Sequence, residues 1–107
     1  MIQITLSLGS PSRYVFYFDT ENTQISDTYY NPILTEDTNI LYVHDERKLI
    51  YRDMFDASKM YREFIRDFSE TAVPSNAVYQ ADIVNNTLHI KYFEGPDLEE
   101  KEEEIAL

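Results

Sequence analysis

The chain begins with a strict alternation of apolar and polar residues. Four apolar residues are separated by three polar ones in the sequence Ile2-Gln3-Ile4-Thr5-Leu6-Ser7-Leu8. Successive side chains of a strand point to opposite faces of a sheet, so this pattern predicts a strand over residues 2–8 with one face buried. Gly9 to Ser12 are turn-forming residues, and we expect them to end the strand.

Three later segments share one arrangement, in which an apolar strand, a short polar turn and a second strand follow one another. The expected hairpins join residues 13–18 to 23–26, 39–43 to 48–55, and 77–84 to 87–93. Asn85-Asn86 suits a two-residue turn because Asn tolerates a positive φ. The pattern predicts a mainly β fold, an antiparallel meander of about seven to nine strands with blade-like or propeller-fragment-like hairpins.

In one segment, residues 57–68, the apolar residues recur with a different period. Its apolar residues follow the spacing i, i+1, i+4, i+5, i+8, and they are Met60, Tyr61, Phe64, Ile65 and Phe68. This spacing places them on one side of a helix, which Asp56 or Ser58 could cap. A strand with the same residues would be apolar on both faces, which only a strand covered on both sides accepts. The periodicity therefore favours one short helix near 57–68.

The acidic C-terminal segment, residues 97–107, fits two structures. Asp97 with Glu100 resembles a capping box at the start of a helix. An edge strand is suggested instead by the alternation of Lys101, Glu103, Ile105 and Leu107. In a strand, the glutamates would protect a free sheet edge, or the edge would pair across a two-fold axis in a homodimer. The length of 107 residues favours a single domain spanning residues 1–107.

Composition and charge argue against several classes of function. The net charge of −11 disfavours nucleic acids and anionic membrane surfaces, since both require a basic footprint. The chain has no Cys, which excludes disulfides and thiolate metal sites, and two Gly are too few for a P-loop or a dinucleotide-binding loop. We expect no membrane insertion, because no stretch is long and apolar enough. Residues 1–4 lack the basic and apolar regions of a signal peptide, so we expect none in this chain.

The sequence also lacks the spacings that catalysis and metal binding require. His44 and His89 lie in or beside expected strands without a ligand motif nearby. Asp19 and Glu21 could bind Ca²⁺ weakly through oxygen atoms, but the EF-hand pattern is missing, so solvated turn acids are the simpler interpretation. We therefore expect no enzymatic activity, no catalytic residues, no cofactor and no metal site.

Aromatic and acidic residues in expected loops remain as candidates for binding. Tyr29 and Tyr30 follow the first hairpin, and Asp19 and Glu21 lie in its turn. Tyr combines a large apolar area with a hydroxyl, which suits contacts with proteins or glycans, although the same rings could fill a small β core. We therefore predict that the chain is a non-enzymatic interaction module and that these four residues form its binding site. The alternative is a small acidic inhibitor or immunity-type protein that occludes a basic partner, because negative charge gives fast, salt-sensitive association.

Several short motifs follow one another along the chain: the turn at residues 23–26, Asn31-Pro32, and the stretches at residues 52–56 and 61–69, followed by a final strand pair. Their order resembles that of uncharacterised blade-like β domains of surface or secreted proteins from Gram-positive gut bacteria. The resemblance implies a blade-like β domain that is exported as part of a longer precursor, and hence an extracellular or cell-surface location. It implies adjacent strands at 48–55 and 60–67 in place of the helix. It carries no catalytic residues.

Overall fold

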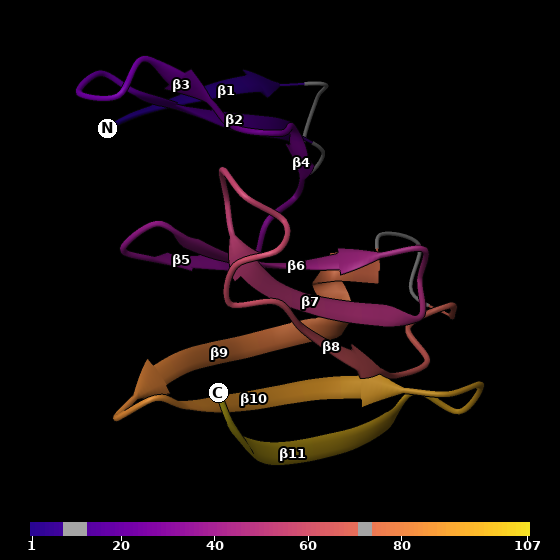
Figure 1. The fold of residues 1–107 in the computed structure, drawn as a ribbon. Helices are drawn as coiled ribbons and strands as arrows, with labels where there is room; N and C mark the ends of the chain where they lie inside the picture. Colours follow the sequence, from indigo (N-terminus) through magenta and orange to yellow (C-terminus); the bar gives the residue numbers. More distant parts are fainter. Residues whose placement is uncertain (8–12, 71–73) are drawn as a thin grey trace.

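Short polar turns reverse the chain wherever the sequence predicts a hairpin. A computed structural model describes residues 1–7, 13–70 and 74–107, and in these ranges eleven strands form three antiparallel sheets (Figure 1). These ranges contain no α-helix, and a 3₁₀ helix, Pro74–Ala77, precedes the last sheet. The predicted mainly β, antiparallel fold is therefore confirmed, with more strands than the seven to nine expected.

Each sheet consists of strands that are consecutive in the sequence. Sheet A contains β1 (Ile2–Ser7), β2 (Arg13–Asp19), β3 (Gln24–Ile25) and β4 (Tyr29–Tyr30). Sheet B contains β5 (Leu34–Glu36), β6 (Asn39–His44), β7 (Lys48–Asp53) and β8 (Arg62–Ile65), paired in that order. Sheet C contains β9 (Val78–Val84), β10 (Thr87–Glu94) and β11 (Glu99–Ala106), with β10 in the centre. In sheet A, β2 pairs with β1, β3 and β4.

The turn between β9 and β10 has the conformation that its two asparagines favour. Asn85 and Asn86 have φ values of 52° and 58°, and the flanking residues Val84 and Thr87 are paired. Two positive φ values in succession define a type I′ turn, whose twist matches that of the strands it joins. The predicted two-residue hairpin turn is therefore confirmed.

Sheet B is the middle layer of a three-layer stack, with sheet A above it and sheet C below it in Figure 1. Alternation along β6 divides its side chains between two cores: Ile40 belongs to the cluster shared with sheet A and Leu41 to the cluster shared with sheet C. The smaller cluster consists of Val15, Tyr17, Tyr29, Ile40 and Met54. The larger cluster consists of Leu41, Leu49, Tyr51, Phe68, Ala77, Val78, Leu88, Ile90 and Tyr92. Both faces of sheet B are therefore covered.

The helix expected near 57–68 is wrong, because β8 occupies part of this segment. β8 pairs with the edge of β7, from Lys48 opposite Ile65 to Tyr51 opposite Arg62. Phe64 packs against the larger core, whereas Ile65 is 60% exposed. Asp56, the expected N-cap, accepts hydrogen bonds from the Ser58 amide (2.9 Å) and hydroxyl (2.6 Å) and so closes a turn. Residues 62–65 form backbone hydrogen bonds with the edge of β7 that would otherwise be unpaired. This pairing determines the structure of the segment, although its apolar residues have a helical spacing.

The acidic C-terminal segment forms an edge strand, which is one of its two expected structures. β11 pairs along β10, from Thr87 opposite Ala106 to Glu94 opposite Glu99. The side chains of Lys101, Glu103 and Ile105 are half-buried, and those of the alternating glutamates are exposed. Exposed charges on an edge strand disfavour uncontrolled strand pairing.

The first strand forms as predicted, but the expectation of a buried face is wrong. Ile2, Ile4 and Leu6 are 50%, 38% and 55% exposed, and β1 contributes no residue to either core cluster. Leu8 and the expected turn at residues 9–12 lie outside the described residues. The alternation correctly predicts which side chains share a face, but in the structure nothing described covers that face.

Candidate interaction surface

The face of sheet A that points away from sheet B is apolar. Strand register places Ile2 opposite Phe18, Ile4 opposite Phe16, and Leu6 opposite Tyr14. Residues that are paired directly in an antiparallel sheet share a face. The same register adds Ile25, opposite Phe18, and Tyr30, opposite Tyr14. We call this set the outer face: Ile2, Ile4, Leu6, Tyr14, Phe16, Phe18, Ile25 and Tyr30.

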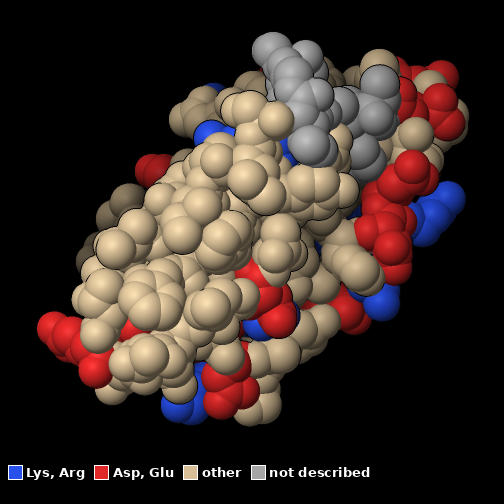
Figure 2. Space-filling view, turned by 90° about the horizontal axis from the view of Figure 1, so that it is seen from above, with Lys and Arg blue, Asp and Glu red and all other residues tan. Residues whose placement is uncertain are grey.

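The outer face is exposed and carries no formal charge. Its most exposed side chain, Ile25, is 68% accessible, and the Tyr14 and Tyr30 rings contact each other with centroids 5.2 Å apart. Figure 2 shows the molecule from the side of sheet A, with a broad area free of Lys, Arg, Asp and Glu and with acidic groups towards its borders. Exposed apolar surface of this kind typically marks an interaction site.

The structure separates the two tyrosines that the sequence predicts as contacts. Tyr30 lies on the outer face and is 38% exposed, whereas Tyr29 is 3% exposed in the core between sheets A and B. The Tyr29 hydroxyl donates a hydrogen bond of 2.6 Å to the carbonyl oxygen of Met54, and burial raises the pKa of this hydroxyl. Tyr29 is therefore a core residue and not a surface contact.

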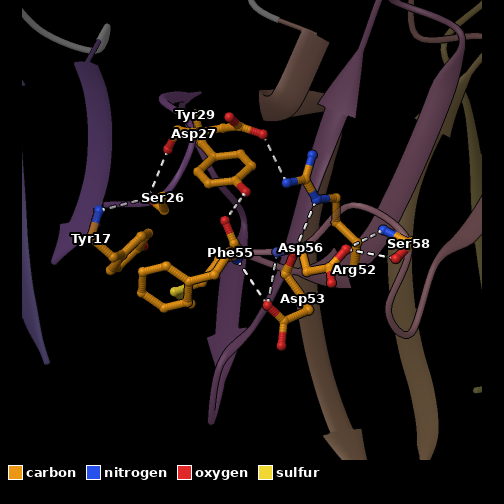
Figure 3. Close-up of polar contacts among 10 residues, drawn as sticks. Tyr17, Ser26, Asp27, Tyr29, Arg52, Asp53, Phe55, Asp56 and Ser58 are labelled. Carbon is orange, nitrogen blue, oxygen red and sulfur yellow. Dashed lines mark hydrogen bonds and ion pairs between the residues drawn. The ribbon is translucent and has the colours of Figure 1, made fainter. Parts of the chain in front are cut away.

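A buried arginine supports Tyr29 at the junction of sheets A and B. The Arg52 guanidinium lies 5.4 Å from the centre of the Tyr29 ring. Its Nη2 donates to Asp27 Oδ2 at 2.9 Å, and its Nε donates to the Asp53 carbonyl oxygen at 3.0 Å (Figure 3). The Arg52 side chain is 9% exposed and Asp27 is 71% exposed, so the pair joins a buried cation to a hydrated carboxylate. These contacts fix the inner face of sheet A against sheet B.

The acidic turn after β2 is closed by its own side chains. Asp19 Oδ1 accepts hydrogen bonds from the amides of Glu21 (3.0 Å) and Asn22 (3.3 Å), and Asp19 Oδ2 accepts one from the Asn22 side chain (2.9 Å). The bond from the Asn22 side chain is the main cause of the lowered pKa of Asp19. Asp19 thus has a local structural role, and Glu21 is exposed beside it.

A second arginine, Arg66, connects the end of β8 to sheet C. Its Nη2 and Nε donate to the two oxygens of Glu103 on β11 at 2.7 and 2.8 Å, and Nε also reaches the Tyr92 hydroxyl at 3.2 Å. The Tyr92 hydroxyl donates to the same carboxylate. Arg66 holds the pKa of Glu103 below its usual value, and burial together with Glu103 raises the pKa of Tyr92 to about 12. The group fastens the β11 edge to the stack.

The remaining polar candidates stay apart. His44 pairs with the neighbouring Asp45 at 2.9 Å and His89 with Glu104 at 3.4 Å, and all four side chains are exposed. No group of three or more His, Asp or Glu side chains within the described ranges is placed to hold a metal ion. No helix in those ranges is long and apolar enough to cross a membrane.

The outer face and the two arginine clusters were not identified from the sequence. Alternation in residues 2–8 determines which residues share a face, but it holds no information about what covers them. Arg52 gave a weak signal, since it directly follows the apolar run Leu49-Ile50-Tyr51 within one strand and a buried charge requires a partner. The partners Asp27 and Glu103 lie 25 and 37 residues away from Arg52 and Arg66, a separation that a local pattern does not reveal.

Comparison with family models, with curated proteins and with solved structures gave no match to this chain.

Proposed function

We propose that this chain is a non-enzymatic interaction module that binds another protein through the outer face of sheet A. The observation that supports the proposal is a sheet face of eight apolar side chains, six of which are between 38% and 68% exposed. Burial of apolar area drives protein association, and aromatic residues are enriched at interfaces. The resemblance to surface and secreted bacterial proteins favours the cell surface as the place where the module acts.

Of the four contact residues predicted from the sequence, only Tyr30 and Glu21 remain candidate contacts in this proposal. Tyr30 lies on the outer face, while Tyr29 and Asp19 have structural partners inside the protein. Glu21 stays a predicted contact in the turn that follows β2. The contacts proposed here therefore come chiefly from β1 and β2.

Site-specific photo-crosslinking tests the proposed surface. A photoreactive benzoyl-phenylalanine replaces Tyr14 on the outer face or Tyr61 outside it; these side chains are 40% and 41% exposed. In cells that produce the protein, we expect the probe at Tyr14 to capture a polypeptide and the probe at Tyr61 to capture none. Mass spectrometry of the adduct identifies what was captured. No adduct from Tyr14, or equal capture from both positions, would contradict the proposal.

The acidic edge strand favours a second candidate function, the occlusion of a basic partner. Four exposed glutamates lie along β11, at positions 99, 100, 102 and 104. The Tyr79 side chain is 43% exposed and donates a hydrogen bond to Glu100, so a probe at position 79 would lie beside these glutamates. For this candidate we expect a probe at Tyr79 to capture the partner, and we expect binding to weaken steeply with salt. Affinity that is indifferent to ionic strength would dismiss it.

A further inference from the structure

We infer that the outer face of sheet A binds the same face of a second copy of this chain, which gives a two-fold symmetric dimer. This inference rests on the proposed function, because it names the partner of the surface proposed above. In the dimer, the two A sheets would pack face to face, with sheets B and C of each copy outside them. The outer face would then be the centre of a six-layer stack.

The area of the outer face is of the size that a stable interface requires. Five of its side chains are between 38% and 55% exposed, and Ile25 is 68% exposed. If a large side chain buries on the order of 150–250 Å² in full, these six side chains expose roughly 400–700 Å². The upper part of this range approaches the ~800 Å² per partner of a standard protein interface.

The distribution of charge favours a second copy over a charged partner. The chain carries a net charge of −11, yet none of the eight side chains of the outer face is charged. A two-fold interface brings identical surfaces together, so any charge at its centre would face a like charge. The acidic strand β11 belongs to sheet C, at the opposite end of the stack from sheet A (Figure 1). Packing through sheet A therefore places the acidic strands of the two copies far apart.

The shape of the outer face also suits a sheet as its partner. Its side chains project from paired strands, as they do on the inner face, where Val15 and Tyr17 pack against sheet B. Sheets pack on each other through apolar faces of similar size, about 10 Å apart. A second outer face meets this requirement in size, polarity and geometry.

The test is the self-association of the purified full chain, measured by analytical ultracentrifugation over a wide concentration range. We expect a reversible dimer for the unaltered chain. Ile4→Glu places two charges inside each dimer and should raise the dissociation constant roughly a hundredfold or more. The matched control is Ile65→Glu, which introduces the same change on β8, at a side chain that is 60% exposed and outside the outer face. It should leave the dissociation constant unchanged.

Each result either supports or overturns the inference. Ile2→Glu, at the start of β1, provides a second test if circular dichroism shows that Ile4→Glu does not fold. A chain that stays monomeric at every concentration overturns the inference, and so does a dimer that survives both substitutions on the outer face. The cross-linking experiment separates this failure from that of the proposed function. An adduct of Tyr14 with a different polypeptide would preserve the interaction module and remove the second copy as its partner.

Discussion

Tyr29→Ala should lower the free energy of unfolding by about 3–5 kcal/mol, the range for removing a large aromatic side chain from a core. Tyr29 is 3% exposed and lies between Tyr17 and Tyr42, with ring centroids at 6.5 and 5.0 Å. The substitution also removes the ring beneath Arg52 and the donor to the Met54 carbonyl. Urea denaturation followed by circular dichroism measures the loss.

The adjacent residue provides the matched control. Tyr30→Ala removes an equal side chain from the outer face, where Tyr30 is 38% exposed and its ring meets that of Tyr14, so we expect a cost of about 1 kcal/mol. Tyr29→Phe keeps the ring but leaves the buried Met54 carbonyl without its donor, which should cost about 1–3 kcal/mol. Equal losses for Tyr29→Ala and Tyr30→Ala would contradict the different positions of the two residues.

Arg66→Ala should destabilise the protein by about 2 kcal/mol, because it removes charge-assisted hydrogen bonds to both oxygens of Glu103. The Arg66 side chain is 24% exposed and that of Glu103 is 31% exposed, so water screens the pair only in part. Thermal denaturation measures the effect. Arg47→Ala serves as the control, because Arg47 is 64% exposed and lies 4.0 Å from Asp67; its removal should have no measurable effect.

The same cluster should make stability depend on pH in the acid range. Arg66 holds the pKa of Glu103 in the folded protein below the ordinary value of 4.5, while the unfolded chain has no such contact. The folded state therefore binds this proton less readily than the unfolded state. The resulting stabilisation is present above pH 4.5 and is lost as the pH falls through the lower, folded pKa.

Glu103→Gln tests this origin of the pH dependence. The variant should be less stable than the unaltered chain at neutral pH, and the difference should shrink as the pH falls below 4.5. Denaturation curves collected from neutral to acid pH give the comparison. A difference that stays constant across the range would show that Glu103 contributes through packing alone.

The hairpins could be predicted because their information is local. Asn85-Asn86 favours positive φ, and the alternating strands on both sides of it determine the register of β9 and β10. The strands at 39–43 and 48–55 were predicted in the same way and correspond to β6 and β7. Turn chemistry and a period of two act over a few residues, so one sequence is sufficient for these elements.

The segment at 57–68 shows why local periodicity failed. Five apolar residues at helical spacing would all be buried by a helix, but Met60, Tyr61 and Ile65 are 47%, 41% and 60% exposed. Met60 has a φ of 54°, which is incompatible with a continuous α-helix through this position. The deciding partner is the edge of β7, where Leu49 lies opposite Phe64 and Lys48 opposite Ile65. Competition of this kind depends on tertiary structure.

The candidate surface was predictable only in part, for a related physical reason. Alternation in β1 and the aromatic residues of β2 indicated which side chains share a face. Burial depends on a second layer, and that layer covers the inner face of sheet A, with Val15 and Tyr17, and not the face of Ile4. Tyr29 and Tyr30 are chemically identical neighbours, and the pleat of β4 alone sends one inward and one outward.

The order of the sheets along the chain bears on how the protein is made. Sheet A uses residues 2–30, sheet B residues 34–65 and sheet C residues 78–106, so no described strand of one sheet comes from the segment of another. Each sheet can therefore form on the ribosome before the next one has been synthesised, because the strands that pair are close to one another in the sequence. If sheet A forms in this way, it would present apolar residues on both of its faces until sheet B covers the inner one, with Val15 and Tyr17.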